Sequence, residues 1–230
     1  MKPVEIVQPP LFGTAADGYR MLYNYHNESI LTNQWPVDVV FVGDSITQLW
    51  ELQGYFGSFG YVVNRGIGGD VADILARRLE ADAIQLKPRV CVVMIGINNT
   101  FCLDEEGNKK TEDDVFRLVV DSHVSILKQL KEASVMPLVC SVTPVFGDDV
   151  FTVDRRNRLV KRINAALREL CEGSTGIRYV DYHTAMLDGD GKLDRSLSWD
   201  GLHPHVLGYN RMAAVLSPVL EETLKGGNGK

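Results

Sequence analysis

Residues 39–47 read VVFVGDSIT and join an apolar run directly to a turn of small polar residues. β-Branched and aromatic side chains that follow one another without clear alternation are typical of a strand buried on both faces, as in a parallel sheet. The polar residues that come next predict a turn into a helix, with Ser45 at its start. In open parallel sheets, ligands bind beyond the carboxyl ends of the strands. This stretch therefore predicts an α/β fold and places Ser45 where a functional side chain is expected.

Apolar runs of strand length recur along the chain, and segments with helical spacing lie between them. The expected strands are Val37–Val42, Val90–Ile95, Leu138–Val142 and Ile177–Val180, with Tyr61–Asn64 as a fifth candidate. Apolar residues follow a helical spacing over 115–130 and over 159–170. Strands that alternate with helices imply right-handed crossovers and a sheet covered on both faces. The prediction is a three-layer α/β/α sandwich.

Local signals mark where some of these helices begin and end. Thr111, followed three residues later by Asp114, is an N-cap signal for the helix over 115–130. Gly173 and Gly176 predict the end of the next helix. Residues 12–34 are rich in Tyr and Asn, and they predict either an outlying helix or a dimer contact.

Length, composition and charge exclude several classes of partner. The chain has 230 residues, which fits one α/β domain. Its net charge is −6 and its Lys and Arg residues are scattered, so we expect no nucleic-acid partner. No stretch reaches the roughly 20 apolar residues of a membrane helix, and the first ten residues lack the apolar region of a signal peptide. We expect a cytoplasmic protein without membrane insertion.

The segment around Ser45 has two interpretations when it is taken alone. A helix N-terminus supplies free N–H groups and a partial positive charge, which suit an oxyanion that forms beside a nucleophilic serine. Asp44, Ser45 or Thr47 could instead simply cap the helix. The segment alone does not choose between these interpretations.

Two more polar segments follow expected strands. Residues 66–70 read GIGGD, and their glycines allow positive φ and a close backbone approach to a ligand. This pattern matches neither the dinucleotide fingerprint nor the phosphate loop, and a tight turn is the alternative. After the run that ends at Ile95, an Asn side-chain amide from Asn98 or Asn99 can donate to an oxyanion, although Asn99 could instead fix the loop.

A fourth polar segment lies near the C-terminus, where residues 199–204 read WDGLHP. The separation of Asp200 from His203 lets the carboxylate bond to the imidazole if the chain makes one turn. In isolation the segment could equally be a surface turn. His205 lies two residues further, but no third ligand at a suitable spacing supports a metal site.

Together, these four segments resemble the blocks of the GDSL esterase family, also called SGNH hydrolases. The blocks, in order, are Gly43-Asp44-Ser45, Gly69, Gly96-Ile97-Asn98 and Asp200-Gly201-Leu202-His203. The resemblance spans residues 37–216 and is closest to the branch of the platelet-activating-factor acetylhydrolase catalytic subunits, because of GIGGD and the Asn98-Asn99 pair. Other members more often carry Gly-x-Asn-Asp in the third block. Asn99 replaces that Asp, which leaves the Asn98 amide in place and bears only on how the loop is fixed.

The resemblance implies a fold and a site. The fold is a flavodoxin-like, parallel five-stranded sheet of order 2-1-3-4-5, in an SGNH hydrolase domain over 37–225. Residues 1–36 would form an N-terminal extension packed on that domain, and 226–230 a disordered tail. The implied catalytic residues are Ser45 as nucleophile, His203 as its base and Asp200, which holds the histidine. The implied oxyanion hole comprises the Ser45 N–H, the Gly69 N–H and the Asn98 side chain, and neither a metal nor another cofactor is expected.

The function expected on this basis is that of a serine esterase. It would cleave short acyl, acetyl-type esters of a small molecule, carbohydrate or lipid through an acyl-enzyme on Ser45. A thioesterase or lysophospholipase of the same mechanism is the nearest alternative, and a carbohydrate-binding protein without turnover is a second class. We expect a small-molecule ester as partner and leave a homodimer open. Aromatic residues at the strand ends could wall a pocket, with at least two of them in the core: Trp50, Phe101, Phe146 and Trp199.

Overall fold

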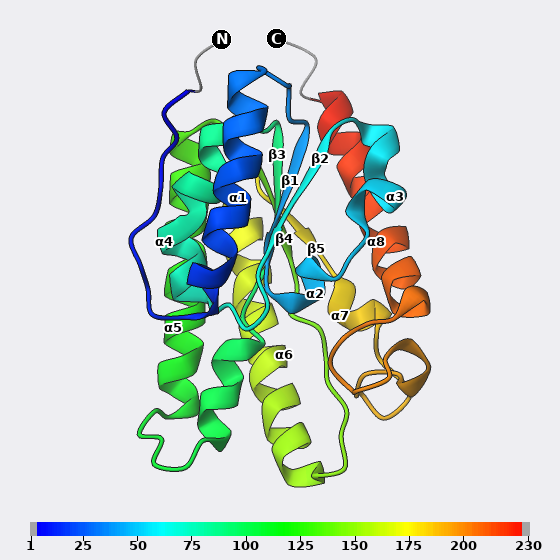
Figure 1. Cartoon of the computed structure of the whole chain (residues 1–230). Helices are drawn as coiled ribbons and strands as arrows, with labels where there is room; N and C mark the ends of the chain where they lie inside the picture. The colour runs from blue at the N-terminus through cyan, green and yellow to red at the C-terminus, as the bar shows by residue number, and fades with distance from the viewer. Residues whose placement is uncertain (1–3, 227–230) are drawn as a thin grey trace.

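A computed structural model describes residues 4–226 and shows a parallel sheet between two layers of helices (Figure 1). The five strands lie in the order β2-β1-β3-β4-β5. Their bounds are β1 Val39–Gly43, β2 Val62–Gly66, β3 Val90–Met94, β4 Met136–Cys140 and β5 Arg178–Val180. All neighbouring strands pair in parallel. The predicted three-layer α/β/α sandwich with a flavodoxin-like strand order is confirmed.

The strands form where apolar runs were expected, but their ends differ by up to two residues. Ile95 and Val142 are buried, yet both lie beyond the last residue of their strand. An apolar run therefore continues past the end of its strand, because the residues beyond the last backbone pairing are still buried. β4 begins earlier than expected, and its Pro137 pairs only with β3, since the pairing with β5 starts at Leu138. A proline without an N–H is tolerated there because no second strand requires its hydrogen bond.

Eight α-helices occur in the part of the chain that the structure describes, and they surround the sheet (Figure 1). They are α1 Ala15–Thr32, α2 Ser45–Gln48, α3 Leu52–Phe56, α4 Ala72–Asp82, α5 Glu112–Glu132, α6 Val150–Glu172, α7 Tyr182–Ala185 and α8 Val206–Gly226. Helices α4, α5 and α6 pack side by side on one face of the sheet, while α3 and α8 cover the other. Short 3₁₀ turns η1 Gly57–Phe59, η2 Ile84–Leu86, η3 Asn98–Asp104 and η4 Arg195–Leu197 complete the connections.

The predicted start of α5 is confirmed by its cap. The Thr111 side chain accepts a hydrogen bond from the Asp114 N–H, and the Asp114 carboxylate accepts one from the Thr111 N–H at 2.9 Å. This reciprocal pair satisfies two of the N–H groups that the first turn of a helix leaves free. Helix α6 ends at Gly173, as expected, but it begins much earlier than its apolar stripe. Its N-cap is Asp149, well before the helical spacing expected over 159–170.

The segment expected to form an outlying helix does so as α1, which packs against α4. The Tyr23 hydroxyl of α1 donates to the Gly66 carbonyl, and the Asn27 amide donates to the Ala81 carbonyl at 2.8 Å. These contacts attach α1 to the end of the edge strand β2 and to α4. Of the tail expected over 226–230, Gly226 is the last residue of α8, and 227–230 lie outside the described residues. Across residues 4–226, no helix has the length and apolar character needed to span a bilayer.

Candidate active site

Ser45 lies at the carboxyl end of β1, where α2 begins. The residue before it provides the cap: Asp44 Oδ1 accepts a hydrogen bond from the Ile46 N–H at 3.0 Å. Asp44 is buried beneath the turn, and this burial raises the pKa of its carboxyl to about 7. The capping and the chemistry are thus divided between two neighbouring residues. The Ser45 hydroxyl is not needed as a cap and is free to bond elsewhere.

The Ser45 hydroxyl meets a histidine from the far end of the chain. Ser45 Oγ lies 2.8 Å from His203 Nε2, across 158 residues of sequence. On the other side of the ring, His203 Nδ1 lies 2.6 Å from Asp200 Oδ2. A hydroxyl, an imidazole and a carboxylate in this sequence of contacts allow the imidazole to take the hydroxyl proton while the carboxylate fixes the ring orientation.

The Asp200 carboxylate is held by the turn that it starts. Its Oδ1 accepts hydrogen bonds from the Leu202 N–H at 2.9 Å and the His203 N–H at 2.8 Å. Partial burial alone would raise the pKa of Asp200, but the hydrogen bonds from His203 and Leu202 outweigh it and hold that pKa well below its usual range. Asp200 therefore stays ionised at neutral pH and is able to accept the hydrogen bond from the imidazole.

Gly201 connects this turn to a second loop. Its φ is +84°, and a Cβ at this position would lie 2.3 Å from the Phe146 carbonyl oxygen. The Phe146 N–H donates to the Gly201 carbonyl at 3.0 Å, which joins the two loops. Only glycine combines this backbone conformation with so close an approach.

Two buried asparagines of α6 fix the loop that carries Phe146. Asn157 bonds to both the N–H and the C=O of Val145, at 2.9 and 2.8 Å. Asn164 does the same with Val142, at 2.8 and 2.9 Å. Neither asparagine stood out in the sequence, because an Asn within a helix gives no sign of which backbone it will meet. Their seven-residue spacing, two helical turns, was the one available signal.

The glycine-rich loop over 66–70 lies beside Ser45. A Cβ at Gly68 would lie 3.8 Å from Ser45 Cβ, and the Gly68 N–H donates to the Gln48 side chain at 2.7 Å. Gly69 has a φ of +77°. The loop closes with a hydrogen bond from the Asp70 N–H to the Ile67 carbonyl at 3.1 Å. The tight-turn interpretation of GIGGD is confirmed, and the turn brings Gly68 close to the serine.

Asn98 and Asn99 have different hydrogen-bond partners. The Asn98 amide donates one hydrogen bond to the Asp70 carbonyl, at 2.9 Å, and an amide carries a second N–H. Asn99 is buried, and its Oδ1 accepts from the Ala72 N–H at 3.0 Å. Asn99 therefore fixes the loop to the start of α4, as the Asp of other family members was thought to do. The structure places Asn98 next to the Gly69 loop.

The residues near the site offer little to a metal ion. Within residues 4–226, no group of three or more His, Cys, Asp or Glu side chains is arranged to bind one. His205 instead accepts a hydrogen bond from the Leu207 N–H at 3.2 Å and packs against Trp199, with ring centroids 5.1 Å apart.

The four aromatic residues expected near the strand ends have different environments. Trp50 is buried in the core, stacked on Tyr209. Phe101 and Phe146 are half-buried and pack against the same core. Trp199 is 88% exposed beside Asp200. The expectation that at least two belong to the core is met, and Trp199 alone projects from the surface next to the site.

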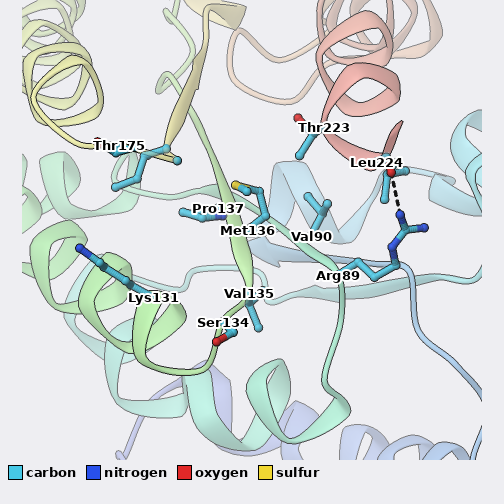
Figure 2. Close-up of a pocket in the computed structure, with 12 residues that line it drawn as sticks. Arg89, Val90, Lys131, Ser134, Val135, Met136, Pro137, Thr175, Thr223 and Leu224 are labelled. Atoms are coloured by element: carbon cyan, nitrogen blue, oxygen red, sulfur yellow. Dashed lines mark hydrogen bonds between the residues drawn. The ribbon is translucent and has the colours of Figure 1, made fainter. Parts of the chain in front are cut away.

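A hollow of about 390 Å³ lies at the opposite end of the sheet from Ser45 (Figure 2). The start of β3, the start of β4 and the end of α8 line it, and the Arg89 side chain donates to the Leu224 carbonyl at 2.7 Å across its rim. None of the residues expected to be functional lines this hollow. In parallel sheets the amino ends of the strands seldom carry the chemistry, which agrees with its separation from the serine.

Comparison with known sequences points in the same direction as the geometry. A model of the GDSL-like lipase/acylhydrolase family matches residues 41–211. An acetylxylan esterase of Geobacillus stearothermophilus is 26% identical over 205 residues, which cover 76% of this chain and 90% of that esterase. The human platelet-activating factor acetylhydrolase IB subunit alpha2 is 24% identical, over 87% of this chain and 83% of that subunit.

Two further similarities concern a longer protein and a solved structure. An N-acylneuraminate cytidylyltransferase of Escherichia coli is 24% identical over 89% of this chain, and this chain spans only 45% of that protein's length. The structure of a GDSL-like lipase from Bacteroides thetaiotaomicron superimposes with a TM-score of 0.70 at 25% identity, over 88% of this chain and 97% of that one.

Proposed function

This chain belongs to the GDSL-like lipase/acylhydrolase family, and from that premise we propose that it hydrolyses short acyl esters through an acyl-enzyme on Ser45. One observation carries the proposal: a continuous pair of hydrogen bonds runs from Ser45 Oγ through the His203 ring to Asp200, at 2.8 and 2.6 Å. The family consists of serine ester hydrolases, and this arrangement is the one that activates a serine hydroxyl for attack.

In the proposed reaction, His203 moves one proton twice. Nε2 takes the Ser45 hydroxyl proton as Oγ bonds to the acyl carbonyl carbon. The tetrahedral intermediate then collapses, and the leaving alkoxide takes that proton and departs as the alcohol. A water molecule repeats the sequence on the acyl-enzyme and releases the carboxylic acid. Asp200 stabilises the imidazolium that exists between the two transfers.

The oxyanion of the tetrahedral intermediate would be bound by the Ser45 N–H, the Gly69 N–H and the second N–H of Asn98. Ser45 is the first residue of α2, so its N–H has no partner within the helix. Asn98 reaches the Gly69 loop through its bond to the Asp70 carbonyl, and its second N–H would be the donor to the oxyanion. Removal of one such donor typically costs about 10²–10³ in rate, or roughly 3 kcal/mol.

The acyl group in the proposal is short, of the acetyl type. Two relatives carry names that denote the removal of acetyl groups, an acetylxylan esterase and a platelet-activating factor acetylhydrolase subunit. Their names differ in the alcohol portion, a polysaccharide in one case and a lipid in the other. The proposal therefore specifies the acyl group and leaves the alcohol as a small molecule, carbohydrate or lipid.

The test is hydrolysis of p-nitrophenyl esters from acetate to decanoate by the wild type and by Ser45→Ala. We expect acetate to be the preferred substrate and the variant to lose about 10³-fold or more in rate. Ser58→Ala, an exposed serine in η1, serves as the matched control and should keep the wild-type rate. Equal rates for Ser45→Ala and the wild type would overturn the proposal, and a preference for decanoate would overturn the acyl specificity.

A further inference from the structure

Arg78 is a buried cation directly behind the candidate active site. Its side chain is 1% exposed and lies on α4, between the carboxylates of Asp70 and Asp82. Arg78 Nη2 lies 2.7 Å from Asp70 Oδ2, and Nη1 lies 2.6 Å from Asp82 Oδ2. Removing a guanidinium from water is costly, so full burial requires that its N–H groups find partners. Arg78 meets that requirement with more than these two carboxylates.

The same guanidinium also binds the ends of two strands. Nη2 donates to the Gly43 carbonyl, at the end of β1, at 3.1 Å. Nη1 donates to the Arg65 carbonyl of β2 at 3.0 Å. Nε donates to Asp70 Oδ2 at 2.8 Å. The planar, rigid fork of the guanidinium therefore fixes the carboxyl ends of β1 and β2 relative to the glycine-rich loop.

Each proposed oxyanion donor is attached close to one of these contacts. Gly43 lies two residues before Ser45, and Asp70 directly follows Gly69. The carbonyl of that same Asp70 accepts the hydrogen bond from the Asn98 amide, at 2.9 Å. One side chain thus connects the three backbone and side-chain donors, which come from three different strand ends.

The Asp70 side chain depends on Arg78 for its position. Asp70 is as deeply buried as Arg78, with 1% of its side chain exposed. Its other oxygen, Oδ1, has no hydrogen-bond partner among the described residues. Without Arg78, the Asp70 carboxylate would lose the ion pair that offsets its burial, and the loop that carries Gly69 would lose its anchor to β1 and β2.

We propose that Arg78 is a positioning residue that sets the spacing of the three oxyanion donors through Asp70 and Gly43. The inference rests on the proposed function, since it assigns a role within that same site. Arg78 does not touch the substrate; it holds in place the groups that do. A displacement of about 1 Å in such groups can cost on the order of 10²-fold in rate.

The alternative is that Arg78 only stabilises the fold, and a matched pair of variants separates the two roles. Asp70→Asn and Asp82→Asn each change one carboxylate on the same guanidinium to an amide of equal size. Only Asp70 belongs to the oxyanion loop. Both variants weaken the buried ion cluster, so both should lower the melting temperature.

The two variants should differ in catalysis. For Asp70→Asn we expect kcat and kcat/KM for p-nitrophenyl acetate to fall together by about 10- to 100-fold, with KM within about threefold of the wild type. Binding of a trifluoromethyl ketone, which forms a tetrahedral oxyanion on the serine, should weaken by the same factor. For Asp82→Asn we expect less than about a threefold change in kcat and in binding of the ketone.

Arg78→Lys extends the test to the central residue. Lysine keeps the positive charge but cannot contact Asp70, Gly43 and Arg65 at once. A folded Arg78→Lys variant should lose kcat and ketone affinity as Asp70→Asn does. If Arg78→Lys fails to fold, the comparison of Asp70→Asn with Asp82→Asn still decides between a positioning role and a purely structural one.

The outcomes distinguish this inference from the proposed function. If kcat falls equally in Asp70→Asn and Asp82→Asn, in proportion to the fall in melting temperature, the positioning role is overturned. Wild-type kcat in Asp70→Asn, with Ser45→Ala inactive, would also overturn it and leave the esterase proposal standing. Full activity of Ser45→Ala would remove the basis of both.

Discussion

The two sides of the Ser45–His203 hydrogen bond are built in different ways. The serine side comprises the ends of β1, β2 and β3, and the Arg78 cluster ties them together across tens of residues of sequence. The histidine side is a turn over 198–203 that precedes α8, and its bonds mostly join residues two or three apart. The side chains of Asp200 and His203 are 53% and 30% exposed, whereas those of Arg78 and Asp70 are 1% exposed.

This difference separates stability from activity. The serine side belongs to the packed core, so a change there disturbs contacts that the whole fold depends on. The histidine side is more exposed, and beyond the bonds within the turn it is held by the link between Phe146 and Gly201 and by the bridge between Ser198 and Pro204. The site thus combines a rigid platform of donors with a surface turn that delivers the base.

The largest expected effect tests whether the two sides act as one unit despite their different construction. His203→Ala should lower the rate by about 10³-fold or more, and the double variant with Ser45→Ala should be no slower than either single variant. Ser45 and His203 take part in the same proton transfer, so removing either residue already removes the whole rate acceleration that the pair provides. The measurement is kcat/KM for p-nitrophenyl acetate, on variants whose fold has been verified. If the loss of kcat/KM in the double variant equals the product of the two single losses, the two groups act independently.

A smaller effect compares one glycine from each side. A Cβ at Gly66 would lie 2.3 Å from the Gln48 N atom, within the core, so Gly66→Ala should lower the free energy of unfolding by about 2–3 kcal/mol. Gly201→Ala creates a clash of the same kind, 2.3 Å from the Phe146 carbonyl oxygen, and its φ of +84° adds strain, so this variant should lose at least as much.

The two glycine variants should also differ in activity. At a temperature where both are folded, Gly201→Ala should be the slower enzyme, because the shifted turn carries His203 away from Ser45. Urea unfolding and kcat measured on the same samples check both parts. An equal loss of kcat in the two variants would contradict the division between the rigid and the local side.

The smallest effect concerns pH and the cap of α2. Burial raises the pKa of Asp44 to about 7, so between about pH 4 and pH 7 the folded protein keeps a proton that the unfolded chain has released. The stability from this group is present at low pH and is lost as the pH rises through about 7. Asp44→Asn should therefore gain stability relative to the wild type, by on the order of 1 kcal/mol, between about pH 5 and pH 7.

The exposed cap of α6 provides the matched control for Asp44. Asp149 accepts a hydrogen bond from Thr152, and its hydrogen bonds lower its pKa. The stability that Asp149 contributes is present above the pKa of this group in the unfolded chain and is lost only in acid. The stability difference between Asp149→Asn and the wild type should therefore stay constant from about pH 5 to pH 7. Parallel stability curves for Asp44→Asn and the wild type would show that the carboxyl is ionised at neutral pH.

Much of the fold was predictable because its signals are local. Apolar runs located all five strands, and the Thr111 and Asp114 pair located the start of α5. The start of α6 was missed because its first turns bury polar residues. Arg156 and Asn157 are buried there against Thr100 and Val145, so no apolar stripe marks those turns.

The candidate site was predictable to a similar extent. The four blocks named Ser45, Gly69, Asn98, Asp200 and His203, and the structure brings all five to one end of the sheet. The residues that support them were not found. Arg78, Asn157 and Asn164 act through partners far away in the sequence, and no spacing along one helix reveals such a partner.

The sequence by itself determined the strands, the cap of α5 and the turn that joins Asp200 to His203, because each depends on neighbours within a few residues. Tertiary structure alone decided that Asp44 rather than Ser45 caps α2 and that Asn99 fixes a loop. It also placed Arg78 behind three strand ends. The physical reason is that a buried polar group is stable only beside a matching partner, and the fold alone determines which partners meet.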